Sequence, residues 1–199
     1  MPHIETLDTT NNLVDIDEVM YFLGIADPAE ERLTDLINEA SIWFNNECDR
    51  QLKSRSQTEY HDYQYSPVLY LDHPPVSAVT LYTNSSIPRA YGTDDIIAAD
   101  NYEIYTEDNI GKLVLTNATF DFGRRTIKVV YTGGFSTIPA DLKSGVLNLI
   151  GQWYWLNKNN AFGVTAHDRP EGSGVTIDRD LPTQTVRAVA RYHRNGWIV

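Results

Sequence analysis

Paired carboxylates are the residues of this chain that could most readily do chemistry. Asp94-Asp95, Asp100 and Glu107-Asp108 would support acid and base catalysis on a sugar if they faced each other across a cleft. They stand in turn-forming sequence, however, where Asp side chains accept hydrogen bonds from their own backbone. A hydrolase that uses these acidic turns is therefore only our third hypothesis for the function.

Two neighbouring pairs of histidine and aspartate offer nitrogen and oxygen ligands for a metal ion. The pairs are His61-Asp62 and Asp72-His73, and their spacing matches no metal-binding signature. Positions at a strand edge or in a turn, where polar residues are ordinary, explain them better. A third pair, His167-Asp168, would suit a proton shuttle, but no nucleophile is identifiable to use it. We therefore expect no catalytic residue, no metal and no cofactor.

Sequence motifs for hydrolysis or nucleotide binding are missing. The chain has no G-x-S-x-G, no H-E-x-x-H, no G-x-x-x-x-G-K-[ST] and no strand-linked G-x-G-x-x-G. Gly133-Gly134 could cradle an anion, but no lysine is in the right place, so we favour a tight exit from a strand. The one cysteine, Cys48, cannot form an internal disulfide and fits a small buried apolar side chain.

Tyrosines invite a binding hypothesis. The chain has twelve, and four of them stand in one segment: Tyr60, Tyr63, Tyr65 and Tyr70. They would suit a stacking platform for sugars or single-stranded nucleic acid. A platform for nucleic acid needs interleaved basic residues, and Arg89 is the only one between Tyr60 and Tyr105. Strand packing explains most of these rings.

Composition indicates a folded protein. Of the 199 residues, 42% are hydrophobic and 22% are charged, which suits one large domain or a core domain with an insertion. No stretch approaches the roughly 18 uncharged apolar residues of a membrane span. Residues 1–12 lack the basic start and apolar run of a signal peptide, so we expect a protein made in the cytoplasm.

Charge is distributed unevenly along the chain. The formal net charge is −11, and residues 1–50, with twelve acids and two bases, account for −10 of it. Residues 179–199 carry four arginines and one aspartate. This polarity argues against a general nucleic-acid binder, whose surface would be basic. It allows an acidic face of one copy to meet a basic face of another.

Two amphipathic helices are predicted before residue 55. Asp15, with Glu18 three residues later, forms a capping box for a short helix that Gly24 ends. Asp27-Pro28 begins a second helix, whose apolar residues recur every three to four positions as far as Leu52.

After about Arg55 the apolar period changes to that of short strands. The strand segments are rich in aromatic and β-branched residues, and turn formers such as Asp72–Pro75 separate them. No crossover helix lies between them, so we expect five to six strands in one compact antiparallel sheet or small barrel. The predicted strands lie around Tyr60–Tyr65 and at Val68–Leu71, Val76–Tyr82, Tyr102–Tyr105, Leu113–Leu115 and Ile127–Tyr131.

Helical spacing returns after Pro139. The apolar stripe of this helix contains Leu142, Val146, Leu149, Ile150, Trp153 and Leu156. Residues 160–178 then hold three glycines and a proline without periodicity, and an arm of this length is either mobile or made to contact something else. Leu181-Pro182 opens a last helix.

We therefore predict an α+β fold, in which an amphipathic helical bundle carries an inserted small antiparallel β domain. The parts are N-terminal helices at 1–55, the inserted β region at 56–135, and two C-terminal helices at 136–199, which include the long arm at 160–178. Residues 1–55 and 136–199 are expected to pack as one helical domain, because neither has enough helices to bury its own apolar faces.

Several short segments, taken in order, carry a family resemblance. Leu69–Thr80 resembles a strand, a double-proline turn and a strand; the others are Asn101–Ile104, Gly111–Leu115, Ile127–Phe135, Ile138–Lys143 and Asp180–Pro182. Their order is similar to that in the head-to-tail connector (adaptor) family of tailed bacteriophages, of the head completion type. The likeness covers about residues 14–195.

This resemblance implies a structural virion protein, not an enzyme, at the head-tail interface. Its copies, commonly twelve, would form a ring beneath the portal protein that extends the DNA channel and offers a docking surface to the tail-side stopper. The arm or the C-terminal helix would dock on the portal, and no membrane would be involved. Compact members of the family have only a small hairpin where residues 56–135 stand, so the resemblance assigns this region no role.

The charge pattern suits a ring for independent reasons. A ring joins one face of a subunit to a different face of the next, and an acidic N-terminal part with an arginine-bearing C-terminal part offers such faces. A mainly acidic lumen would repel DNA phosphates, so that the genome passes without specific binding.

Residues of the arm and the C-terminal segment are the expected partner contacts. Trp197 is the most suggestive, because aromatic anchors concentrate interface energy; for the arginines, a solvated helix face is an equal explanation. The set is Arg187, Arg191, Arg194, Trp197, His167 and Arg169. The alternative function is a carbohydrate- or receptor-binding virion module built on the tyrosine-rich β region.

Overall fold

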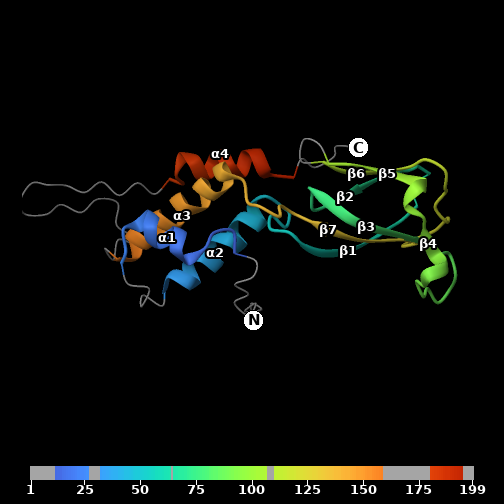
Figure 1. Ribbon diagram of the computed structural model, residues 1–199, viewed down its shortest axis with the longest axis horizontal. Coiled ribbons are helices and arrows are strands. Elements are labelled where there is room, and N and C mark those ends of the chain that lie inside the picture. Colours follow the sequence, from blue (N-terminus) through green and yellow to red (C-terminus); the bar gives the residue numbers. More distant parts are fainter. Residues whose placement is uncertain (1–11, 27–31, 64, 107–109, 159–179, 195–199) are drawn as a thin grey trace, which may run out of the picture. The chain divides into compact units, whose positions relative to one another are not determined.

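The structure is a computed structural model whose chain divides into two units (Figure 1). It describes residues 12–26, 32–63, 65–106, 110–158 and 180–194. The helical unit comprises Met1–Cys48 and Ile138–His193, and the β unit comprises Asp49–Thr137 and Arg194–Val199. Within the described residues there are four α-helices and two antiparallel sheets, so the fold is α+β, as predicted. No helix in these ranges is long and apolar enough to cross a membrane.

Helix α1 (Ile16–Leu23) begins and ends at the residues that the sequence predicts. The Asp15 N–H donates a hydrogen bond to Glu18 Oε2 at 3.1 Å, which satisfies a backbone donor at the helix start. Gly24 ends the helix with a φ of +69°, a left-handed backbone that glycine adopts without a Cβ penalty.

Helix α2 (Arg32–Glu47) ends earlier than predicted. Asp49 has a φ of +50°, which turns the chain out of the helix before Leu52. Cys48 and Leu52 are both fully buried, but neither is on the helix. The predicted start at Asp27-Pro28 lies outside the described residues. The apolar spacing therefore extends to Leu52 although the helix ends at Glu47, because the segment after the helix is also buried.

Helices α3 (Ala140–Lys158) and α4 (Thr183–Tyr192) approach each other closely at Gly145. A Cβ at this position would lie 2.7 Å from the Cβ of Ala188, nearer than real Cβ contacts come. Thr185 Oγ1 also donates a hydrogen bond to the Gly145 carbonyl at 2.8 Å, in a buried setting. Along α3 the predicted stripe is buried at Leu142, Val146, Leu149 and Ile150; beyond it Tyr154 is buried, and Trp153 only partly so.

The β unit contains two sheets instead of the one that the sequence predicts. The four-stranded sheet has the order β1 (Arg55–His61), β7 (Ile127–Gly133), β3 (Val76–Thr83), β4 (Ile96–Ile97). The three-stranded sheet has the order β2 (Val68–Leu71), β6 (Gly111–Leu115), β5 (Tyr102–Tyr105). All pairings are antiparallel, as expected from the short connections.

One hydrophobic core serves both sheets. Strand β7 lies between β1 and β3, and its residues alternate between the core face, which includes Ile127, Val129 and Tyr131, and the other face. Leu69, Leu71, Leu113 and Leu115 reach the same core from the three-stranded sheet. Short 3-10 turns at Thr93–Asp95 and Ala99–Asn101 flank β4. The core explains why strands of both sheets show apolar alternation.

Two predicted details of the β region differ in the structure. The first strand is β1, which starts at Arg55 and stops before Tyr65; that tyrosine has a φ of +58° and is exposed. Strand β4, with two residues, is too short to give a periodic signal. The Gly133-Gly134 pair is a tight strand exit, as predicted, because a Cβ at Gly133 would lie 2.5 Å from the His73 carbonyl oxygen.

Gly145→Ala should destabilise the helical unit. The added methyl group overlaps Ala188, and the cost of overpacking, about 1–3 kcal/mol, exceeds the gain in helix propensity of at most about 1 kcal/mol. Urea unfolding of the full chain measures the difference. The control is the double variant Gly145→Ala/Ala188→Gly, in which the opposing methyl group is removed. It should lose less than the two single variants added together, and strict additivity would contradict the proposed overlap.

Candidate functional site

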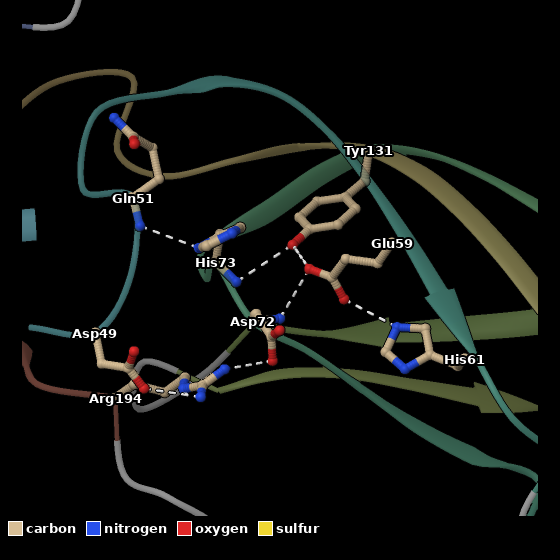
Figure 2. A network of polar contacts seen from close by, with 8 residues as sticks. All are labelled: Asp49, Gln51, Glu59, His61, Asp72, His73, Tyr131 and Arg194. Atoms are coloured by element: carbon tan, nitrogen blue, oxygen red, sulfur yellow. Dashed lines mark hydrogen bonds and ion pairs between the residues drawn. The ribbon is translucent and has the colours of Figure 1, made fainter. Parts of the chain in front are cut away.

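A partly buried carboxylate, Glu59, lies at the centre of a polar network of the β unit (Figure 2). Its Oε1 accepts hydrogen bonds from the Asp72 N–H at 3.1 Å and from the Tyr131 hydroxyl, and its Oε2 lies 2.9 Å from His61 Nε2. Burial opposes the charge on Glu59, but the donors from His61, Tyr131 and Asp72 outweigh it, so the pKa of Glu59 lies below its ordinary value. Glu59 is therefore ionised at neutral pH.

Tyr131 links the carboxylate to the turn that follows β2. Its ring is almost fully buried, and its hydroxyl donates to Glu59 and accepts a hydrogen bond from the His73 N–H at 3.2 Å. Burial first, and then the nearby charge of Glu59, raise the pKa of Tyr131 well above its ordinary value. The hydroxyl therefore stays protonated and cannot serve as a base or nucleophile near neutral pH.

His73 is held as a neutral ring. Its Nδ1 accepts a hydrogen bond from the Gln51 N–H at 3.0 Å, so this nitrogen carries no proton. Burial lowers the pKa of His73, and the neighbouring charges of Glu59 and Asp72 only partly offset this effect. A proton on Nδ1 would break the bond to Gln51.

Arg194 bridges two carboxylates at the edge of this network. Its Nη1 lies 2.5 Å from Asp72 Oδ1 and its Nη2 lies 2.8 Å from Asp49 Oδ2 (Figure 2). Asp49 is the first residue of the β unit, and Arg194 is the first residue after the chain leaves α4 and His193. The ion pairs therefore join the point where the chain enters the β unit to the point where it returns to it.

The network is built for structure and not for reaction. The groups at its centre have protein partners, and none is a nucleophile beside a free base. No group of three metal-ligating side chains gathers anywhere in the described ranges. The structure brings His61, Asp72 and His73 together, but through hydrogen bonds centred on Glu59 and not as ligands of a metal ion. Sequence reasoning missed Glu59. It stands two positions before His61 in β1, so the alternation of a strand places both side chains on the same face, and this spacing could have indicated their contact.

The described residues of the acidic turns take part in the local structure of those turns. Asp95 Oδ2 accepts a hydrogen bond from the Gly92 N–H at 2.7 Å, and this bond lowers the pKa of Asp95, as expected for a carboxylate that caps its own turn. Asp62 likewise accepts the Arg125 N–H at 2.7 Å. Asp100 lies in the turn before β5. Glu107-Asp108 and His167-Asp168 lie outside the described residues.

The predicted partner contacts fall in three places. Arg187 is exposed on α4, while Arg191 Nη1 lies 3.0 Å from Asp141 Oδ2 on α3. Asp141 also accepts the Tyr192 hydroxyl at 2.7 Å, and its pKa lies below the ordinary value because these partners outweigh its partial burial. Arg194 belongs to the β-unit network. His167, Arg169 and Trp197 lie outside the described residues.

A second cluster of chemical interest combines tyrosines with basic residues that sequence reasoning did not associate with them. We call Tyr60, Tyr82, Tyr91, Arg89, Arg125 and Lys128 the basic–aromatic cluster. Strand β7 places Lys128 opposite both Tyr60 of β1 and Tyr82 of β3, with Nζ 4.9 Å from the Tyr82 ring centre. The Arg125 guanidinium lies 4.7 Å from the Tyr60 ring centre. These are cation–π contacts.

The cluster encloses an open pocket of about 300 Å³, lined by Tyr60, Arg89, Tyr91 and Arg125. The Tyr91 hydroxyl fixes one wall, because it donates a hydrogen bond of 2.5 Å to the Arg125 carbonyl. Residues Tyr60 to Tyr105 hold only one basic residue, but strand pairing adds Arg125 and Lys128 from more than 30 positions away. The basic–aromatic cluster could therefore be recognised only once the pairing of the strands is known.

Comparison with known proteins gives one family and several similar structures. A family model described as head completion protein matches residues 12–195. No curated protein matches the chain. A chain in the neck of a native GTA particle, computed with C12 symmetry, has a TM-score of 0.63 and 17% identity, and the match covers 96% of this chain and 92% of that chain.

Two further structures of the same kind of particle are also similar. A chain of the virion of a native gene transfer agent (GTA) particle has a TM-score of 0.64 and 16% identity, covering 96% of this chain and 93% of that one. A chain in the neck of an empty GTA particle, computed with C6 symmetry, has a TM-score of 0.60, 16% identity and the same coverage. At these identities the likeness shows a shared fold over almost the whole chain.

Removing the hydroxyl of Tyr131 should destabilise the β unit by about 1–3 kcal/mol. Tyr131→Phe takes one donor from Glu59 and leaves the His73 N–H without its acceptor in a partly buried site. Tyr60→Phe is the matched control, because Tyr60 is 44% exposed, and its loss of stability should stay within about 0.5 kcal/mol. Denaturant titration of both variants measures the effects, and equal losses would contradict the role given to Tyr131.

Acidification should destabilise the β unit in two steps. The folded-state pKa values of His73 and Glu59 lie below their ordinary values of 6.5 and 4.5, so the unfolded chain takes up protons at a higher pH than the folded chain does. Stability is therefore full above about pH 7, falls first through His73 and falls again below about pH 5 through Glu59. Urea midpoints measured between pH 8 and pH 4 follow both steps.

The His73→Asn variant separates the first step from the second. Its amide oxygen can still accept the Gln51 N–H, but the side chain does not titrate. The variant should lose the stability change between about pH 7 and pH 5.5 while keeping the change below pH 5. A slope in the upper interval equal to that of the unmodified protein would show that another group titrates there.

Proposed function

The chain belongs to the head completion protein family, and from this membership we propose that it is a head-to-tail connector that forms a ring beneath the portal protein. The match over residues 12–195 is the observation that carries the proposal, because it spans both the helical and the β unit. Membership of the family makes the protein a structural, non-enzymatic component of a phage-like virion. The polar groups described above agree with this assignment, since they stabilise the fold.

We place the ring between head and tail. It extends the DNA channel and provides a docking surface for the tail-side stopper. The ring has twelve copies in this proposal. Similar chains occur in particle necks that were computed with C12 and C6 symmetry, and this likeness of fold supports a ring. The protein is made in the host cytoplasm and ends in the virion at the head-tail interface.

Charge supports the passage of DNA without specific binding. The chain has a formal net charge of −11, so a ring of identical copies carries a large negative charge. Phosphates are repelled by an acidic lumen, which lets the genome slide. A charge map of the assembled ring tests this point, because a continuously basic lumen would contradict it.

A division of labour between the two units is part of the proposal. We propose that residues 1–55 and 136–199 form one helical domain and that residues 56–135 are an inserted β domain. The division of the chain at Cys48 and Thr137 supports this arrangement, with boundaries a few residues from the proposed ones. The helical domain and the arm at 160–178 are assigned to the portal.

The portal contacts are assigned to Arg187, Arg191, Arg194, Trp197, His167 and Arg169. Arg187 is exposed and available. Arg191 and Arg194 already have carboxylate partners in their own chain, so a portal would have to compete with or add to these ion pairs. Trp197 is the strongest anchor on chemical grounds, because a large aromatic side chain buries much apolar area at an interface.

A carbohydrate- or receptor-binding module remains the alternative function. The observation that favours it is the pocket lined by Tyr60 and Tyr91, since sugars stack on tyrosine rings. Arg125 and Lys128 already occupy positions over rings of this cluster, which reduces the faces open to a sugar. Glycan binding by the full chain, in the absence of any ring on the portal, would favour this alternative.

Imaging provides the direct test of the connector. The purified chain mixed with its portal protein should give rings on the portal in negative-stain electron microscopy. Failure to bind the portal, or binding as single copies, would overturn the proposal.

Truncation tests the portal-docking role of the C-terminal segment. Removal of residues 195–199 should weaken portal attachment at least about tenfold, through loss of Trp197, and leave the melting temperature unchanged. Removal of residues 194–199 should also lose the ion pairs of Arg194, which are partly exposed and worth less than about 1 kcal/mol. Arg194→Ala in the full chain is the control for this smaller effect. A loss of stability as large as the loss of attachment would argue against docking.

A further inference from the structure

The basic–aromatic cluster holds cations that have no carboxylate partner among the described residues. Arg89, Arg125 and Lys128 form no ion pair there, whereas Lys143, Arg191 and Arg194 each do. Arg89 and Arg125 are exposed, and both line the 300 Å³ pocket. Two guanidinium groups that line one pocket suit a carboxylate, which accepts paired hydrogen bonds from arginine.

Exposed aromatic rings lie on the loop that carries Arg125 and on the segment that follows β1. Tyr65 is 76% exposed and Phe122 is 65% exposed, with ring centres 5.5 Å apart, and Tyr63 contacts both. Phe122 and Arg125 belong to the short loop before β7, and this loop is tied to the end of β1 by the Tyr63 N–H, which donates to the Gly123 carbonyl at 3.0 Å. The rings and the cations therefore form one surface, which we call the β tip. It consists of Tyr65, Phe122, Arg89 and Arg125.

Helix α1 presents the complementary chemistry. Asp15 and Asp17 are exposed, and Tyr21, one turn after Asp17, is 92% exposed. Glu18 is already engaged, because its Oε1 lies 2.6 Å from Lys143 Nζ. The free face of α1 thus combines carboxylates with an aromatic ring, where the β tip combines guanidinium groups with aromatic rings.

We infer that the β tip of one copy binds the free face of α1 on the next copy. Asp17 pairs with Arg89 and Arg125, and Tyr21 packs against Tyr65 and Phe122. The contact joins two different faces, so it is heterologous and repeats around a closed ring; in this respect the inference rests on the proposed function. It gives the β unit, which the family resemblance leaves without a role, a task in holding the ring together.

A second copy fits the β tip better than DNA does. The loops and turns at the same end of the sheet carry four carboxylates, which belong to Asp62, Asp94, Asp95 and Asp121. These carboxylates would repel a continuous row of phosphates. The two exposed carboxylates of α1, Asp15 and Asp17, meet less of this repulsion than a row of phosphates would. The chain as a whole is acidic, so the basic patch is the exception that a neighbouring acidic helix would match.

Charge reversal on each side of the contact tests the inference, because either reversal alone should disrupt the contact and the two together should restore it. The variants Arg125→Glu and Asp17→Lys are each purified as the full chain and assembled on tailless heads that carry the portal. Each alone should reduce ring yield at least about tenfold at physiological salt, because every contact of the ring then joins like charges. An equimolar mixture should form rings again, since alternating copies meet with opposite charges. The double variant on one chain should do the same.

Arg124→Glu is the matched control. Arg124 is exposed and adjacent to Arg125, but it does not line the pocket, so the same change of charge should leave ring yield unchanged. A loss equal to that of Arg125→Glu, or a mixture of the two reversed variants that forms no rings, would overturn the inference.

Cross-linking provides a second measurement that does not depend on charge. Cys48 is buried, so cysteines introduced by Tyr21→Cys and Phe122→Cys are the reactive ones among the described residues. A short bismaleimide added to assembled rings of the double-cysteine chain should give a ladder of covalent oligomers, and either single-cysteine chain should give none. Absence of a ladder from well-formed rings would overturn the inference.

The outcomes distinguish this inference from the proposed function. If all variants form rings as the unmodified chain does, the protein is a connector whose copies meet elsewhere. If the unmodified chain forms no ring on its portal, both proposals fail. If rings are unaffected but Arg125→Glu abolishes binding of double-stranded DNA or of a glycan array, the β tip serves that ligand and the self-contact is wrong.

Discussion

The partly buried charge of Glu59 is the constraint on which the β unit depends. A carboxylate on the core side of a sheet is tolerated only when donors surround it. Here they come from three segments: the same strand, the turn after β2 and strand β7. The same turn supplies Asp72 to Arg194 and His73 to the backbone of Gln51. Satisfying one charge therefore orders the segments around it.

Local features of the fold could be predicted from the sequence, but the network and the β tip could not. The cap of α1 depends on residues three positions apart, and the Gly133-Gly134 turn depends on two adjacent ones. Glu59 and Tyr131, by contrast, are 72 positions apart, and Lys128 meets Tyr60 and Tyr82 only because β7 lies between β1 and β3. A sequence pattern reports the period of a strand and not its neighbours. The apolar pattern also predicts a later end for α2 than the structure has, because burial continues beyond Glu47, where the helix stops.

The histidines, tyrosines and acidic turns of the sequence are residue types that are common in active sites. In the structure Glu59, His73 and Tyr131 are hydrogen-bonded to one another or to nearby backbone, and their pKa values shift because of burial together with that bonding. Perturbed titration is common in catalytic sites, but a satisfied structural network produces it as well. What distinguishes the two is an unsatisfied group facing an accessible space. In the described part of the chain, that combination occurs at the exposed β tip, where it suits recognition.

The pairing of β1 with β7 has a consequence for how such a protein can evolve. These strands are the first and last of the β unit, they pair from Arg55 with Gly133 to His61 with Ile127, and Lys53 forms a bridge with Phe135 just outside them. The two ends of the segment therefore leave the sheet as neighbours. Strands added or deleted at the far edge, beyond β4, would leave both attachment points where they are. The β segment can thus be replaced as a whole, and it can gain or lose strands during evolution without changing the positions at which it joins the helices.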